Sequence, residues 1–258
     1  MFCTGAAPTA REAREKTVVL FKGHDGYAPE ALPVFERAQL IIFIQCNAST
    51  CKLDLRAAFP AAKALAFIDS PAEYVARALS LLPVTKSIRI TLCGLDAPLV
   101  RAVAQRADGA RLSIGDISAD LIEEFAAAIP AGARPDDISL SVRRDADELP
   151  EVLAAIPSLT SLNIAGCAKI THLPATPLAQ LHHLNATGSG IARWPDWISA
   201  CHGMLAVFVD RCPHVPALVD SLPGAWLDAD TPEIFLAPQD HARVPPDHPW
   251  HHKLLSSD

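Results

Sequence analysis

The sequence has no long apolar run, no concentration of basic residues and no familiar catalytic motif. The longest apolar candidate, Leu40 to Ile44, has the length of a β-strand, whereas a transmembrane helix needs roughly 18 residues. We therefore expect no membrane-spanning segment. Residues 1–5 also lack the basic segment and following apolar stretch of a secretory signal peptide, so we expect no cleaved signal peptide.

The charge balance gives no sign of a nucleic-acid ligand. The formal net charge is −7 with the histidines neutral, and lysine and arginine do not gather into a patch. Affinity for a phosphate backbone rests mainly on contacts with these two residue types. We expect no binding to nucleic acid and no binding to a membrane.

The catalytic motifs G-x-S-x-G, H-E-x-x-H, G-x-G-x-x-G and the P-loop are all absent. We therefore expect neither enzymatic activity nor a cofactor. Four histidines, at positions 241, 248, 251 and 252, lie close to the C-terminus, and imidazoles bind metals. The stretch around them is rich in proline and offers no helix that would hold two ligands on one face. We expect no metal there, and a metal-dependent enzyme built on these histidines is the alternative.

Four of the seven cysteines share one phase of a repeat of roughly 23 residues, a period typical of stacked solenoids. They are Cys46, Cys93, Cys167 and Cys212. We call this position the slot, and each repeat a coil. The residues three and five positions before each slot are apolar, as in Ile41 and Phe43 before Cys46. Further coils with the same apolar pair and another slot residue are Val18/Leu20/Gly23, Leu65/Phe67/Ser70, Leu112/Ile114/Ile117, Ile138/Leu140/Arg143, Leu184/Ala186/Ser189 and a short tenth, Ala225/Leu227/Asp230.

Because alternate residues of a strand point to the same side, each apolar pair predicts one short strand that faces the core. Strands that alternate with helices are also typical of a doubly wound α/β domain. The even spacing of the coils favours the solenoid. At about 4.8 Å per strand, slots two coils apart are separated by roughly 10 Å, which exceeds the ~7 Å Cα limit of a disulfide. We expect free, buried thiols whose donors are directed at backbone groups in the turns.

The coils resemble the leucine-rich repeat family. The best match, residues 159–174, reads L-x-x-L-x-I-x-x-C-x-x-I-x-x-L-P, and two more follow at residues 181–195 and 204–218. The resemblance covers about Val18 to Asp230 and implies an α/β horseshoe-shaped solenoid with a concave parallel β-sheet. The sequence departs from the family in lacking the leading leucine of the first six coils, and in placing Arg143 in a slot that should be buried.

Local signals divide the convex side into two halves. In the first half, helix starts are predicted at Ser70-Pro71-Ala72-Glu73, at Asp96, at Ser118 and at Asp145 to Glu148. After Pro174, prolines disfavour full helices, so we expect short turns, with Asp196 to Cys201 as an exception. We expect an N-terminal capping helix in residues 1–17, about nine or ten coils in residues 18–237, and a Pro/His-rich tail or cap in residues 238–258.

The concave sheet would expose the residues two and four positions before each slot. We expect a protein partner to bind there, because exposed apolar and aromatic patches mark such surfaces. The candidate residues are Phe21, Ile42, Ile44, Arg89, Asn163, Asn185, Phe208, Asp210, Trp226 and Asp228. Two alternatives stay open: the segment before Val18 or the loop Gly23 to Tyr27 covers the first patch, and a different register or the tail buries the aromatic residues.

These features predict a monomeric, non-enzymatic module that binds another protein on its concave face. The chain also resembles bacterial leucine-rich repeat proteins with short L-P coils, several of which are delivered into host cells as type III effectors. That resemblance implies a virulence role, and a protein that stays in the cytoplasm or is secreted into a host cell. The alternative is the substrate-recognition part of a ubiquitin-ligase effector, with the catalytic part on another chain.

Overall fold

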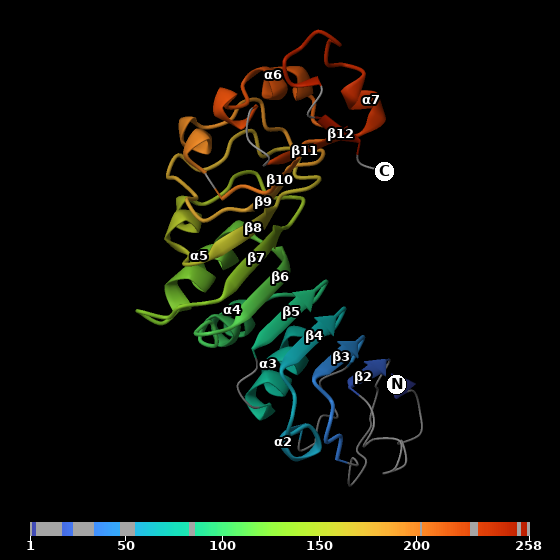
Figure 1. Cartoon of the computed structure of the whole chain (residues 1–258). Coiled ribbons are helices and arrows are strands. Elements are labelled where there is room, and N and C mark those ends of the chain that lie inside the picture. Colours follow the sequence, from blue (N-terminus) through green and yellow to red (C-terminus); the bar gives the residue numbers. More distant parts are fainter. Residues whose placement is uncertain are drawn as a thin grey trace. The chain divides into compact units, whose positions relative to one another are not determined.

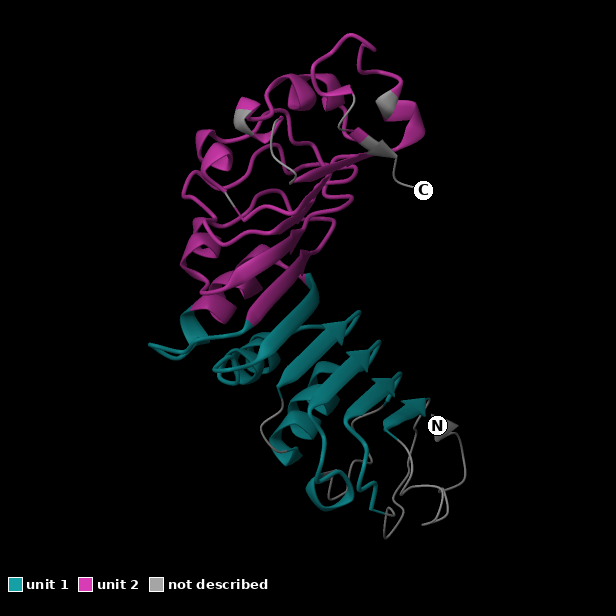
Figure 2. Ribbon diagram, in the orientation of Figure 1, with its two compact units in different colours: residues 1–116, 127–136 teal, residues 117–126, 137–258 magenta. Residues whose placement is uncertain are grey.

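A computed structural model of the chain describes residues 2–3, 17–22, 34–46, 55–82, 86–201, 203–227, 232–251 and 254–256. The chain forms two compact units, which Figure 2 shows in different colours. Unit 1 comprises Met1–Asp116 and Ala127–Asp136, and unit 2 comprises Ile117–Ala126 and Asp137–Asp258.

Unit 1 is a parallel sheet with helices in the connections between its strands (Figure 1). The strands lie in chain order: β1 (Phe2–Cys3), β2 (Val18–Lys22), β3 (Leu40–Ile44), β4 (Ala64–Ile68), β5 (Ser87–Thr91) and β6 (Arg111–Ile117). The helices are α2 (Leu55–Ala58), α3 (Ala72–Leu81) and α4 (Ala97–Ala104), and α5 (Ala119–Ala128) follows β6. Alternate strand residues such as Ile41 and Phe43 are fully buried, and Tyr74 of α3 contacts Phe43 at a ring distance of 5.8 Å. The core therefore lies between the sheet and the helices.

Unit 2 has the same plan, with shorter helical elements between its strands. Its parallel strands also lie in chain order: β7 (Asp137–Val142), β8 (Leu159–Asn163), β9 (His183–Asn185), β10 (Ala206–Phe208), β11 (Glu233–Leu236) and β12 (Leu254–Ser256). Between them lie the 3-10 helices η2 (Glu151–Ala155), η3 (Asp196–Ala200) and η4 (Gly224–Trp226), and the short helices α6 (Val215–Asp220) and α7 (Pro238–His241).

The predicted α/β class and parallel sheet are confirmed, and the sheet is not closed into a barrel. A doubly wound domain reverses its strand order at a switch point, whereas the strands of each unit follow the chain order. The predicted thinning of the connections after Pro174 is also confirmed, because the helical elements described there have six residues or fewer. No helix in the described part of the chain is long and apolar enough to cross a membrane.

The slot side chains of unit 1 form a column and make hydrogen bonds with the backbone of neighbouring coils. Ser70 Oγ accepts a hydrogen bond from the backbone N of Cys46 at 3.2 Å, and Cys93 Sγ accepts one from the backbone N of Ser70 at 3.5 Å. All three side chains are buried. Ser70 and Cys93 therefore each satisfy a backbone N–H of the coil before, which would otherwise be buried without a partner.

In unit 2 the slot thiols bind backbone carbonyl groups of the coil before them. Cys167 Sγ donates to the carbonyl of Arg143 at 3.5 Å, Cys212 Sγ donates to the carbonyl of Ala186 at 3.0 Å, and Ser189 Oγ lies 3.8 Å from Cys212 Sγ. Burial raises the pKa of the Cys167 and Cys212 thiols, so both stay protonated at neutral pH. The prediction of free, buried thiols with a structural role is confirmed for the four slot cysteines.

The residue just before each slot takes a left-handed backbone conformation. In unit 1 these residues are Gln45, Asp69, Leu92 and Asp116, and in unit 2 they are Gly166, Gly188 and Arg211, with φ between 49° and 78°. Except at Asp116, which lies within β6, these residues follow the end of their strand, where the chain turns toward the core side. The sixth coil is different: Val142 does not share it, and Arg143 is exposed and paired with Asp145 at 2.7 Å. Arg143 therefore avoids burial through a different turn.

The predicted register of the first coil is wrong. Val19 and Phe21 are buried and pair with Ile41 and Phe43, so they face the core in place of Val18 and Leu20. The Phe21 and Phe43 rings stack at 5.2 Å. Because Val18 to Phe21 is apolar at every position, alternation does not distinguish its two faces.

The predicted tenth coil is also wrong. Trp226 lies in η4 and is buried, and the strand of the tenth coil is β11, whose Ile234 pairs with Val207. The step from Val207 to Ile234 is 27 residues (234 − 207) in place of the 18 expected. Asp228 lies outside the described residues.

Of the predicted helix starts, the one at Ser70 is right apart from its cap, and the one at Asp145 is wrong. Ser70 fills the slot and donates to the carbonyl of Ile68, so it does not cap α3, which begins after Pro71. No α-helix follows Asp145 to Glu148; the turn is η2. Asp96 does cap α4, because its carboxylate accepts a hydrogen bond from the backbone N of Leu99 at 2.8 Å. Of the predicted capping helix, residues 4–16 lie outside the described part, and Phe2–Cys3 form strand β1.

The C-terminal segment packs against unit 2 and extends its sheet through β12. The buried carboxylate of Asp240 accepts hydrogen bonds from Arg243 Nη1 at 2.9 Å and from the backbone N of Arg211. His248 Nε2 pairs with Asp220 at 3.0 Å. Among the described residues no group of three His, Cys, Asp or Glu side chains is arranged to hold a metal ion; His252 lies outside that part of the chain.

Candidate partner-binding site

The face of each sheet opposite the helices is formed by the strand residues that alternate with the buried ones. In unit 2, pairing brings one such residue from each of five successive strands into a line. We call it the open-face row: Ser141, Asn163, Asn185, Phe208 and Phe235. All five side chains are half-buried. Neighbouring members lie about 4.8 Å apart, the spacing of paired strands.

Two aromatic side chains occupy one end of the open-face row. The rings of Phe208 and Phe235 stack with centroids 4.4 Å apart and planes inclined by 9°. Stacked rings are held by mutual contact and lose little rotamer freedom when a partner covers them. Aromatic side chains are also enriched at protein interfaces.

Two amide side chains continue the open-face row. Asn163 Oδ1 accepts a hydrogen bond from the backbone N of Ala165 at 2.9 Å, and Asn185 Oδ1 accepts one from the backbone N of Thr187 at 3.1 Å. A backbone N–H can only donate, so these bonds fix which end of each amide is the oxygen. The two Nδ2 groups make no hydrogen bond with the described residues, and they are donors available to a ligand.

The remaining candidates of this region do not join the open-face row. Asp210 is 7% exposed and follows the end of β10, so its carboxylate is not offered on the face as predicted. Trp226, 5% exposed, belongs to the core. The sequence analysis missed Phe235, which takes the place predicted for Trp226. The overlooked signal was the strand-like Glu233-Ile234-Phe235-Leu236, which repeats the pattern of Ala206-Val207-Phe208-Val209.

The open face of unit 1 is mainly apolar. Ile42 and Ile44 lie on it as predicted and are half-buried, and Arg89 is exposed at its β5 end. Phe21 was predicted there but faces the core, and Val18 of β2 is 40% exposed in its stead. The loop Gly23 to Tyr27, proposed to cover this patch, lies outside the described residues.

No family model matches the sequence, and no curated protein is significantly similar to it.

Proposed function

We propose that this protein is a leucine-rich repeat module that binds another protein on its open face, with the open-face row of unit 2 as the main contact. The observation that carries the proposal is the in-register line of two amide donors followed by two stacked aromatic rings. Such a line presents polar and apolar contacts side by side on a single surface.

The two parts of the open-face row suit different groups of a polypeptide. The stacked rings of Phe208 and Phe235 would cover an apolar side chain of the partner, and burial of such a side chain contributes about 1.5–3 kcal/mol. The Nδ2 groups of Asn163 and Asn185 would donate to its backbone carbonyl oxygens. Because strand pairing and the turn hydrogen bonds already hold these side chains, binding orders few new rotamers and loses little entropy.

The family assignment is part of the same proposal. It is supported by the L-x-x-L-x-I-x-x-C pattern, by the slot column and by the left-handed residue before each slot. The biological setting that we propose, an effector that acts on host proteins, rests on the resemblance alone.

The test is affinity capture with matched variants. The double variant Phe208→Asp/Phe235→Asp is compared with the wild-type protein and with Ala217→Asp, which places one negative charge on the exposed side of α6. Proteins captured from candidate host lysate are quantified by mass spectrometry, and folding is followed by thermal melting. We expect the double variant to lose the specific partner with little change in melting temperature, and Ala217→Asp to retain it.

Equal capture by all three proteins would show that the partner does not use the open-face row. A large fall in the melting temperature of the double variant would call for Phe208→Ser/Phe235→Ser, which removes the aromatic surface without adding charge. Retained capture by this variant would likewise contradict the proposal.

A further inference from the structure

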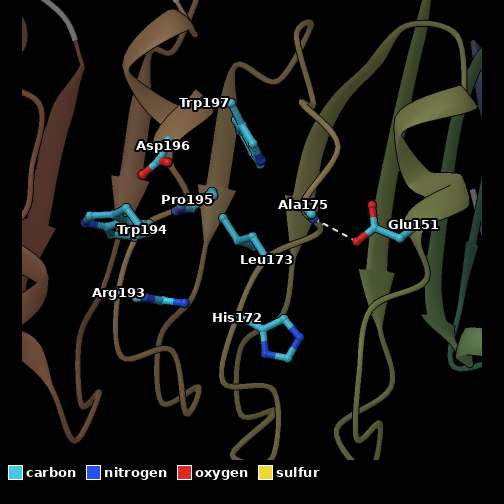
Figure 3. A pocket seen from close by; sticks show the side chains of 9 residues that line it. All are labelled: Glu151, His172, Leu173, Ala175, Arg193, Trp194, Pro195, Asp196 and Trp197. Carbon is cyan, nitrogen blue, oxygen red and sulfur yellow. Dashed lines mark hydrogen bonds between the residues drawn. The ribbon is translucent and has the colours of Figure 1, made fainter.

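A second candidate surface of unit 2 lies away from the open-face row, at the turns that follow strands β7, β8 and β9 (Figure 3). It is a groove of about 570 Å³, within the roughly 300–1,000 Å³ range of small-molecule sites. Its apolar wall consists of Leu173, Trp194, Pro195 and Trp197. Charged and polar side chains from three successive coils complete the lining.

Three of the lining residues make hydrogen bonds between neighbouring coils. Trp197 Nε1 donates to the carbonyl of Pro174 at 2.9 Å, and Trp194 Nε1 donates to the carbonyl of Leu218 at 2.9 Å. The carboxylate of Glu151 accepts hydrogen bonds from the backbone N of Ala175 at 2.7 Å and of Thr176 at 3.0 Å. Each of these bonds links one coil to a neighbouring coil, so stacking of the repeats accounts for all three side chains.

Two other lining residues, Arg193 and His172, make no such hydrogen bond between coils in the described part of the chain. Arg193 is exposed and makes no hydrogen bond or ion pair with the described part of the chain. His172 Nδ1 is hydrogen-bonded to Thr171 Oγ1 at 3.1 Å, and its Nε2 remains available to another partner. The two side chains come from neighbouring coils, four residues after Ser189 and five after Cys167. Figure 3 shows the guanidinium of Arg193 extending toward the imidazole of His172 on the same rim of the groove.

We propose that this groove binds a small-molecule carboxylate with an apolar body. The carboxylate accepts charge-assisted hydrogen bonds from Arg193 and from His172 Nε2–H, and the apolar body lies against Leu173 and Trp194. The charge distribution of the groove favours this orientation. The Glu151 carboxylate is already held by two backbone amides, and Asp196 lies beyond Trp194 and Pro195 from the guanidinium in Figure 3.

The test uses phenylacetate as the probe and neutral phenylacetamide as its isosteric control, each titrated into the full chain. Binding is followed by the NMR signals of the arginine side chains and of the tryptophan indoles. A probe of about ten non-hydrogen atoms that uses both the rim and the wall should saturate the groove with a Kd of about 1 mM. We expect saturable shifts of the Arg193 and Trp194 signals with phenylacetate, weaker binding in high salt, and no saturation with the amide.

Matched variants locate the site. Loss of a charged hydrogen-bond partner lowers affinity about ten-fold or more, so Arg193→Gln should bind phenylacetate at least that much more weakly. Arg211→Gln removes the same charge from another exposed position of unit 2 and should bind as the wild-type protein does. Three results would overturn the proposal: no saturation with phenylacetate, equal binding of the amide, or equal losses in the two variants.

Discussion

At the scale of single residues, most of the turns place a left-handed residue before the slot, and the turn at Arg143 does not. Glycine adopts this conformation freely, as at Gly166 and Gly188, whereas an L-residue with a side chain pays about 1–2 kcal/mol. Leu92 is the least suited of the set, because it has a bulky side chain at φ 54° and that side chain is 62% exposed.

Leu92→Gly should therefore stabilise the protein. The relief of backbone strain exceeds the added flexibility of glycine in the unfolded chain, which costs about 0.5–1 kcal/mol, so we expect a net gain of about 0.5–1 kcal/mol. The measurement is the free energy of unfolding in urea. Leu205→Gly is the control, since Leu205 is also exposed, at 44%, but does not adopt positive φ; this variant should be destabilised. Destabilisation of both variants to the same extent would contradict the role assigned to the turn.

The two ends of the Asn185 amide have separate roles, which one isosteric substitution can separate. Asn185→Asp keeps an oxygen for the backbone N of Thr187 and replaces the Nδ2 donor by a second acceptor. We expect an unchanged melting temperature and affinity for the partner reduced about ten-fold or more, because a lost donor leaves a carbonyl unpaired in the complex. Calorimetry with the purified partner would give the affinity, and an unaltered value would mean that the amide does not contact the ligand.

The slot residues show what the sequence predicts well at this scale. The spacing alone predicts that Cys46, Cys93, Cys167 and Cys212 are buried at equivalent positions, because stacked coils repeat the same buried position, and all four are buried within their own units. Arg143 departs from the pattern, and its turn departs with it. The spacing carried no sign of how the chain would avoid burying that charge.

At the scale of elements, neighbouring coils are joined by side chains that bind the backbone of the next turn. The Glu151 carboxylate at the start of η2 receives the backbone N–H groups of Ala175 and Thr176, and these two bonds lower its pKa. A carboxylate with a lowered folded-state pKa contributes stability above its ordinary pKa, near 4.3, and that contribution is lost as the pH falls through the folded-state value.

Glu151→Gln should therefore be less stable than the wild-type protein at neutral pH, and the difference should shrink as the pH is lowered below about 4. Urea unfolding at pH 7 and at pH 3.5 measures the two free energies. Glu148→Gln, at an exposed position of the same connection, should match the wild-type protein at both values. A deficit of Glu151→Gln that is as large at pH 3.5 as at pH 7 would argue against an ionised link between these coils.

The elements that the sequence misplaced share a physical cause. β2 is apolar on both faces, so only its neighbours decide that Phe21 stacks on Phe43. The last coils vary in length, and the fixed period pointed to Trp226 when the chain instead needs 27 residues to reach Ile234. Ser70 carried a local helix-start signal, but burial in the slot gave its hydroxyl another partner. In each case tertiary packing decided between two locally acceptable arrangements.

At the scale of the whole molecule, each unit is built by stacking equivalent positions. Surface residues at equivalent positions of successive coils therefore also form lines. Within unit 2 this places Phe235 beside Phe208 and in line with the two asparagines, although the four residues span 73 positions of the chain (235 − 163 + 1). The sequence predicted three of these four residues, because three of the strands were placed correctly. The fourth, Phe235, was missed because the repeat period did not predict the position of its strand, β11.

The most direct test of the proposed function is a site-specific photocrosslink to the captured partner. A photoreactive phenylalanine analogue placed at position 208 lies in the open-face row, and the same analogue at position 217 lies on the exposed side of α6. We predict a crosslinked adduct with the partner from position 208 and none from position 217. An adduct from position 217 alone, or none from either position while the partner is still captured, would contradict binding through the open face.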